Sequence, residues 1–206
     1  MKKLFFLLML LLWPPASLAG SSSHVPHQIA GISLGKQAAM YQGLLRMETA
    51  IPVRDQPFLT EVETGELPGY LSGSVIMGNC ANPGVIVRIK LKYAFADLEF
   101  YEELLHRFKR KFGEPDEWRG DPFRIVRAWK WSFHDKQDNK ITLLLQHSRD
   151  VEEKFGTSVK LTNSTLMEKE RLCYSQKKAK PGRKQQKEVT IKRPRTDEEF
   201  QPYIPQ

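Results

Sequence analysis

Hydrophobic and polar residues alternate most regularly in the run VIVRIKLKY, which spans Val85 to Tyr93. Its apolar members fall on one side of an extended chain: Val85, Val87, Ile89, Leu91 and Tyr93. Its three basic members, Arg88, Lys90 and Lys92, fall on the other side. A period of two is typical of a strand with one buried and one solvated face, so we predict such a strand here.

Shorter alternating runs, bounded by glycine or by polar turn residues, predict further strands. These runs are 28–35, 58–64, 70–78, 123–133, 140–147 and 157–163. The polar segment HDKQDN joins two of them and indicates a hairpin. Residues 36–58 mix helix and strand signals, and Gly43 argues against a long helix there.

A helical period replaces the alternation after Asp97, which we expect to cap the N-terminus of the helix. The apolar residues at helical spacing are Leu98, Tyr101, Leu104, Leu105, Phe108 and Phe112. Glu103 and Arg107 are spaced to form an ion pair along the helix. Gly113 then ends the helix.

Together these elements predict a single α+β domain over residues 28–175. We expect an antiparallel sheet of about five to seven strands, with the long amphipathic helix 97–112 packed on one face. A short C-terminal helix is predicted over 164–174, capped near Asn163 or Ser164.

The predicted strand 123–133 carries two tryptophans. Its large apolar residues share one face: Phe123, Ile125, Trp129, Trp131 and Phe133. We interpret this face as the inner wall of the domain, because an exposed face of that kind would be an unusually large apolar patch. The alternative is a platform on which a ligand stacks. Arg127 is the misfit on this face, and we expect its stem to be buried and its head to reach water.

The two ends of the chain differ in composition from its middle. Residues 1–19 combine two lysines, an apolar run and small residues, which predicts a secretory signal peptide cleaved near Ala19. We expect a flexible leader at 20–27 and a disordered basic tail at 176–206. The mature protein would then be periplasmic or secreted, and no later segment is apolar enough to span a bilayer.

The net charge of +8 is unevenly distributed. Residues 176–206 hold nine basic and four acidic residues and residues 1–19 hold two lysines, which leaves +1 for residues 20–175. Because the predicted domain is near neutral, we expect no nucleic-acid partner.

The two cysteines, Cys80 and Cys173, are a disulfide candidate if the protein is exported to an oxidising compartment. The bond would tie the C-terminal helix to the edge of the sheet and close a loop of about ninety residues. The alternative is two separate thiols.

No known catalytic motif is present: the chain lacks G-x-S-x-G, H-E-x-x-H, C-x-x-C and the P-loop. His147 follows an alternating apolar run and is expected in the core. We therefore predict no catalytic residue, no metal and no cofactor. One enzymatic alternative stays open, a carboxylate-dependent hydrolase, although we favour a solvated loop. Its acidic residues lie in the loop 114–121: Glu114, Asp116, Glu117 and Asp121.

The polar face of the predicted sheet is rich in basic residues. The candidate binding residues are Arg88, Lys90, Lys92, Arg124 and Lys130, together with Trp118 and Arg119 in the neighbouring loop. Such a surface could bind an anionic envelope component or an acidic protein. The alternative is a solvated face with cross-strand charge pairs.

Our leading hypothesis is an exported, non-enzymatic protein that binds a macromolecular or anionic envelope partner. A structural or assembly subunit of the cell envelope is the second non-enzymatic hypothesis. The sequence does not indicate an oligomeric state.

Three runs, CANPGVIVRIKLKY, FYEELLHRFKRKFGEPDEWRGDPF and AWKWSF, resemble a family of small secreted or periplasmic proteins from sulfate-reducing and related bacteria. The resemblance covers about Ile29 to Cys173 and leaves out the tail. No function is assigned to that family, so the resemblance implies a bacterial, exported, single-domain protein and assigns no catalytic residue.

Overall fold

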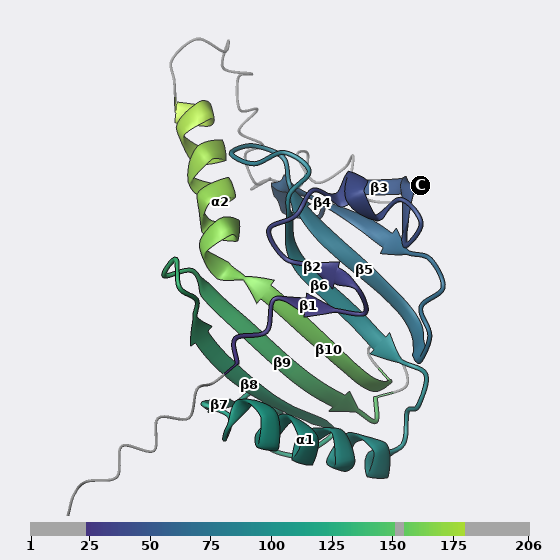
Figure 1. The fold of residues 1–206 in the computed structure, drawn as a ribbon. Helices are drawn as coiled ribbons and strands as arrows, with labels where there is room; N and C mark the ends of the chain where they lie inside the picture. The colour runs from purple at the N-terminus through teal and green to yellow at the C-terminus, as the bar shows by residue number, and fades with distance from the viewer. Residues whose placement is uncertain (1–23, 151–154, 180–206) are drawn as a thin grey trace, which may run out of the picture.

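The computed structural model describes residues 24–150 and 155–179. The predicted signal peptide, residues 20–23 of the predicted leader and residues 180–206 of the predicted tail lie outside these residues. The described chain is α+β, with one large antiparallel sheet and two α-helices (Figure 1).

Eight strands form the large sheet in the order β3-β4-β5-β6-β10-β9-β8-β7. Their bounds are β3 Leu45–Val53, β4 Gln56–Thr64, β5 Tyr70–Gly78, β6 Ile86–Tyr93, β7 Glu117–Trp118, β8 Val126–His134, β9 Lys140–Ser148 and β10 Gly156–Asn163. The last strand in the sequence, β10, lies in the middle of the sheet, where it joins the half built before α1 to the half built after it.

The two helices lie at opposite ends of the sheet (Figure 1). Helix α1 (Leu98–Phe112) follows β6, and helix α2 (Ser164–Ala179) follows β10. Because β6 and β10 are antiparallel neighbours, the chain leaves them at opposite ends.

One face of the sheet is buried beneath α1 and the N-terminal segment. That segment contains the hairpin of β1 (Gln28–Ile29) and β2 (Ile32–Ser33) and the 3-10 helix η1 (Ala38–Tyr41). Its residues Ile32 and Ala38 lie in the same hydrophobic cluster as Tyr101 of α1 and Trp131 of β8. Burial at roughly 1.5–3 kcal/mol per large side chain makes this cluster the main source of stability.

Helix α1 has the features predicted for it. The Asp97 carboxylate accepts a hydrogen bond from the Phe100 backbone N–H at 2.8 Å. The Arg107 Nε lies 2.7 Å from Glu103 Oε1. The last turn ends at Gly113, whose φ of 83° is favourable for glycine and whose N–H donates to the Lys109 carbonyl at 2.9 Å.

The number of strands and the length of the second helix differ from the prediction. The described sheet has eight strands rather than five to seven, because the ambiguous residues 36–58 contain β3 and the acidic loop contains the two-residue β7. The predicted strand 28–35 does not join this sheet and forms the separate hairpin of β1 and β2. Helix α2 is not short: it has 16 residues and ends at Ala179, past the point where the tail was expected to begin. Lysine, glutamine and alanine in that stretch all favour helix.

The tryptophan strand is partly as predicted. Trp131 is 1% exposed, and its ring packs edge-on against Phe108 of α1 at 5.9 Å. Its Nε1 donates to the Gly113 carbonyl at 2.8 Å. Phe123 and Ile125 were wrongly assigned to this inner face, because β8 begins only at Val126 and both residues lie in the turn before it.

The opposite face of the sheet carries most of the polar side chains, and we call it the polar face. It is defined by Glu61, Ser74, Lys90, Leu144 and Lys130, one from each of five strands. Helix α2 packs at one end of the sheet. Its residues Leu166 and Met167 pack against the buried cluster of Leu59, Ile76 and Val87.

Candidate functional site: a charged groove on the polar face

A single register row crosses all eight strands on the polar face. In sheet order its residues are Arg46, Glu63, Ser74, Lys90, Lys160, Leu144, Lys130 and Glu117. Each neighbour in the row is a direct cross-strand partner, at which side chains lie close enough to interact. The row therefore brings together charges that are far apart in the sequence.

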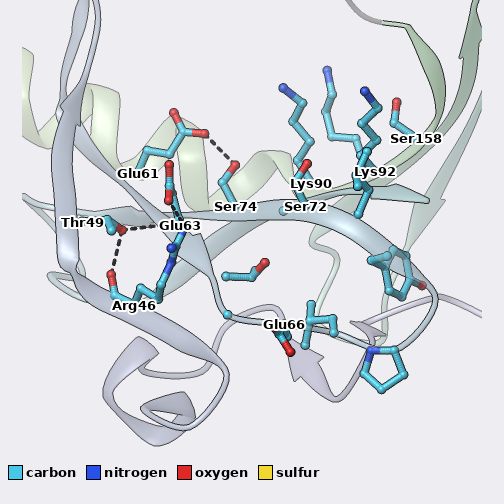
Figure 2. Close-up of a pocket in the computed structure, with 18 of the residues that line it drawn as sticks. Arg46, Thr49, Glu61, Glu63, Glu66, Ser72, Ser74, Lys90, Lys92 and Ser158 are labelled. Carbon is cyan, nitrogen blue, oxygen red and sulfur yellow. Dashed lines mark hydrogen bonds and ion pairs between the residues drawn. The ribbon is translucent and has the colours of Figure 1, made fainter. Parts of the chain in front are cut away.

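A groove of about 1280 Å³ lies over this row. Strand β4 contributes the carboxylates of Glu61 and Glu63 to it, while β6 contributes Lys90 and Lys92. Figure 2 shows the side chains of Lys90 and Lys92 rising side by side from the sheet, apart from Glu61 and Glu63. The groove thus has an acidic side and a basic side.

Strand β5 separates the two sides and has small side chains at this point. Ser72 and Ser74 face the groove, beside Lys92 and Lys90 in the register. The hydroxyl of Ser74 donates to Glu61 Oε1 at 2.6 Å, so it holds that carboxylate on the acidic side. These small residues leave the space between acid and base open to a ligand.

The acidic side is largely engaged within the protein. The guanidinium of Arg46 pairs with the Glu63 carboxylate directly across β3 and β4. The Thr49 hydroxyl accepts the Glu63 backbone N–H at 2.9 Å and donates to the Arg46 carbonyl at 2.7 Å. Arg46 therefore neutralises one carboxylate of the groove.

The basic side is different. Within residues 24–150 and 155–179, neither Lys90 nor Lys92 forms an ion pair with a carboxylate. Lys90 stands directly opposite Lys160 of β10, and like charges in that position destabilise a sheet.

Arg88 belongs to the same strand but has a structural role. Its Nε donates to Thr162 Oγ1 at 3.2 Å, and one terminal nitrogen contacts Met167 Sδ at 3.4 Å. Burial lowers the pKa of this guanidinium, and the nearby Glu61 carboxylate opposes that effect. Arg88 therefore fastens α2 to the sheet and is only partly available to a ligand.

A second, smaller groove of about 280 Å³ continues the polar face toward β7. It shares Leu144 and Lys160 with the first groove and is also lined by Lys130 and Arg119. Both of these cations pair with Glu117, at 3.0 Å for Lys130 Nζ and 2.8 Å for Arg119 Nε. The hydrogen bond from Lys130 is the main reason why the pKa of the Glu117 carboxyl is lowered.

Two predicted binding residues lie away from the grooves. Arg124 does not lie on the polar side of a strand, since its φ of 56° places it in the turn before β8. Trp118 packs edge-on against Trp129 at 4.9 Å, at the outer edge of the sheet. Of the residues proposed from the sequence, Lys90 and Lys92 are the two that the main groove brings together.

The four carboxylates of the acidic loop each have a structural partner. Glu114 pairs with Lys109 at 2.7 Å, and Asp116 accepts the Ser132 backbone N–H. Glu117 pairs as described above, and Asp121 accepts backbone N–H groups of its own turn. Hydrogen bonds from the Val126 and Phe123 backbone help to lower the pKa of Asp121, which is the opposite of the shift that a general acid needs.

The most unusual buried group was not found from the sequence. Glu170 of α2 is 0% exposed, and its carboxylate accepts backbone N–H groups of the loop after β5. The donors are Cys80 at 2.6 Å, Ala81 at 3.0 Å and Asn82 at 2.5 Å. The sequence alone does not distinguish Glu170 from the other charged residues of this polar helix.

The predicted disulfide is present beside this buried carboxylate. Cys80 and Cys173 are bonded, with their Cα atoms 5.8 Å apart. The bond and the Glu170 carboxylate both join α2 to the loop 79–82, and a Cβ atom at Gly78 would collide with the Glu170 side chain. The loop, α2 and the sheet edge thus form one connected unit.

His147 has the buried position expected of it. Its Nδ1 lies 3.0 Å from Thr157 Oγ1, and its ring packs against Tyr101. Burial lowers the pKa of the imidazole and raises the pKa of the Tyr101 hydroxyl to about 12. Both groups lie in the core, away from the charged groove.

Among the residues that the structure describes, no three His, Cys, Asp or Glu side chains gather closely enough to hold a metal ion. No helix in the same part of the chain has the length and apolar character needed to cross a membrane.

Comparisons of the chain with protein-family models, with curated proteins and with solved structures found no match. The function is therefore argued from the groove and its charges.

Proposed function

We propose that this chain is an exported, non-enzymatic protein that binds an anionic envelope polymer in the groove on the polar face. Lys90 and Lys92 would contact the carboxylate or phosphate groups of the polymer, and Ser72 and Ser74 would leave room for its backbone. Lys90 and Lys92 have no carboxylate partner in the described chain, and Lys90 lies next to Lys160 in the register. This observation carries the proposal.

The disulfide supports export. Disulfides persist in oxidising compartments and are rare in the cytosol, so a bonded Cys80–Cys173 pair fits a periplasmic or secreted protein. The expected signal peptide points the same way.

The hydrolase alternative gains no support from the acidic loop. Its four carboxylates are engaged in structural hydrogen bonds or ion pairs, and the pKa of Glu117 and of Asp121 is lowered rather than raised. A general acid at neutral pH needs the opposite shift.

The proposal is tested by measuring the affinity of the full mature chain for polygalacturonate, a polymer of carboxylated sugars, by titration calorimetry. Neutralising both lysines in a K90Q/K92Q variant should weaken binding about tenfold, since an exposed ion pair contributes roughly 0.2–1 kcal/mol and 1.4 kcal/mol is a tenfold change. Added salt should weaken the wild-type affinity.

The matched control is K136Q/K169Q, which removes the same charge at two exposed lysines outside the groove. It should bind within about twofold of the wild type, because 0.4 kcal/mol is about a twofold change. Equal weakening in both variants would mean that net charge alone, not the groove, holds the polymer. Unchanged binding in K90Q/K92Q would overturn the proposal.

A further inference from the structure

The turn that connects β7 to β8, residues 119–126, exposes two large apolar side chains at its tip, and we call it the Phe123 turn. Phe123 is 81% exposed, the highest value for any large apolar side chain in the described chain, and Ile125 is 44% exposed. Water contact with so much apolar surface is unfavourable, so neighbouring exposed side chains of this kind mark interaction sites.

The Phe123 turn is held in this shape by its own hydrogen bonds. The Asp121 carboxylate accepts the backbone N–H of Phe123 at 2.8 Å and also that of Val126. The Asp121 carbonyl accepts the N–H of Arg124 at 3.2 Å, and the Ile125 carbonyl accepts the N–H of Arg149 at 3.0 Å. These bonds fix both ends of the turn to the sheet.

The turn also contains a residue with a sparsely populated backbone conformation. Arg124 has a φ of 56°, a left-handed conformation that is uncommon for residues other than glycine. Such conformations persist where the surrounding structure demands them, and they cluster at functional sites. The hydrogen bonds and the backbone conformation of the turn therefore hold the tip in its exposed position.

Two arginines lie in or beside the turn, together with the Asp121 carboxylate, which is already engaged by backbone N–H groups. Arg124 lies between Phe123 and Ile125, and Arg149 runs beside it, with its terminal nitrogen 3.5 Å from the Arg124 carbonyl. Neither arginine forms an ion pair with a carboxylate within the described ranges 24–150 and 155–179. Trp118, 39% exposed, lies at the start of the turn, where its ring is close to Gly120 and packs against Trp129.

We propose that the Phe123 turn is a peripheral contact with an anionic lipid bilayer. Phe123 and Ile125 would enter the boundary between headgroups and acyl chains, while Arg124 and Arg149 would contact lipid phosphates. Apolar insertion combined with basic residues is the pairing that gives stable interfacial binding, and tryptophan favours the same depth. A single exposed aromatic turn without cations would not select anionic lipid.

The test is co-sedimentation of the full mature chain with phosphatidylcholine vesicles that either contain or lack phosphatidylglycerol. Wild-type protein should bind the anionic vesicles and should show little binding to the neutral ones. An F123S/I125S variant should lower the partition coefficient onto anionic vesicles about tenfold, and R124Q/R149Q should lower it by a similar factor.

The matched control is F95S, which removes an aromatic ring that is 58% exposed in the loop between β6 and α1. Its partition coefficient onto anionic vesicles should stay within about twofold of the wild-type value, because Phe95 lies outside the Phe123 turn. Circular dichroism of each variant separates loss of binding from loss of folding. If F123S/I125S binds as tightly as the wild type, or if F95S loses as much, the bilayer contact is not made by this turn.

Two further outcomes would overturn the proposal. If wild-type protein forms a dimer in sedimentation velocity and F123S/I125S does not, a second copy of the chain covers the tip. If the wild-type protein binds neither kind of vesicle, the proposed bilayer contact is also wrong.

This inference does not rest on the proposed groove function. The K90Q/K92Q variant separates them, since it should lose polymer binding and keep the contribution of Phe123 and Ile125 to vesicle binding.

Discussion

At the scale of single residues, Glu170 shows how a charge can be stable inside this fold. Its carboxylate is fully buried but accepts three backbone N–H groups from residues 80–82, and the Asn82 side chain donates a fourth hydrogen bond at 3.2 Å. Hydrogen bonds to a charged acceptor are stronger than neutral ones. The same bonds satisfy donors that would otherwise be buried without partners.

Replacing Glu170 by alanine should therefore be strongly destabilising. An E170A variant leaves three backbone N–H groups without their acceptor, and each unsatisfied buried donor costs about 1–3 kcal/mol. We expect the free energy of unfolding in urea to fall by about 3 kcal/mol or more.

The E168Q variant is the comparison, because Glu168 lies on the same helix but is exposed and paired with Arg171. It should change stability by less than about 1 kcal/mol. Equal stability of E170A and the wild type would show that the loop donors find other partners.

Single residues were predictable where the signal was local. Asp97 was identified as a cap because a short acidic side chain preceded a helical period, and it caps the helix. Glu170 could not be identified, because its donors lie in a loop about ninety residues away in the sequence. Arg124 was misplaced because an alternating pattern contains no sign that the backbone turns to positive φ.

At the scale of elements, β8 shows how two tryptophans on one face of a strand can differ in burial and in their contribution to stability. Trp131 is buried against Phe108 of α1, whereas Trp129 is partly buried beside Trp118 of edge strand β7, with Lys109 6.0 Å from its ring centre. The strand pattern makes the two residues equivalent, and their neighbours distinguish them.

The W131A variant should lose about 3–5 kcal/mol of unfolding free energy, the usual cost of truncating a buried aromatic side chain to alanine. The W129A variant should lose clearly less, because its ring is partly solvated already. Urea denaturation followed by far-UV circular dichroism measures both. A larger loss in W129A than in W131A would contradict the assignment of the inner wall.

Regular elements were predictable and irregular ones were not. Helix α1 and most of strand β6 bury one face, so their periods of 3.6 and two residues are clear. Val87 is the exception in β6: it packs in the cluster beside α2 and not with Ile89, because the register against β5 shifts at this point. Strand β3 lies at an edge, is largely exposed and is interrupted by register shifts against β4, so its apolar pattern is broken. Helix α2 is polar on most sides, so no stripe marks where it ends.

At the scale of the whole molecule, the sheet order decides the character of the candidate site. The sequence placed Arg88, Lys90 and Lys92 on one side of a strand, but it did not show that β10 returns between β6 and β9. That crossover sets Lys160 against Lys90, while the β4-β5-β6 order puts Glu61 and Glu63 on the other side of β5 from Lys90. A surface expected to be partly basic, with a few acidic residues, is divided into an acidic and a basic side.

The same topology makes the Cys80–Cys173 bond a long-range constraint on the entire domain. The two residues are 93 positions apart, and the bond links the loop after β5 to the final helix, so it encloses β6 to β10. In the chain-entropy model, closing a loop of this length in the unfolded chain stabilises the folded state by about 3–5 kcal/mol.

A C80S/C173S variant should therefore lose about 3–5 kcal/mol of unfolding free energy relative to the oxidised wild type. Wild-type protein unfolded with and without reductant should show the same difference, while the variant should be insensitive to reductant. Its affinity for polygalacturonate should stay within about twofold of the wild type where the variant remains folded, because Lys90 and Lys92 are positioned by the sheet. A variant that is folded yet no longer binds would show that α2 and its disulfide shape the groove as well as stabilise the domain.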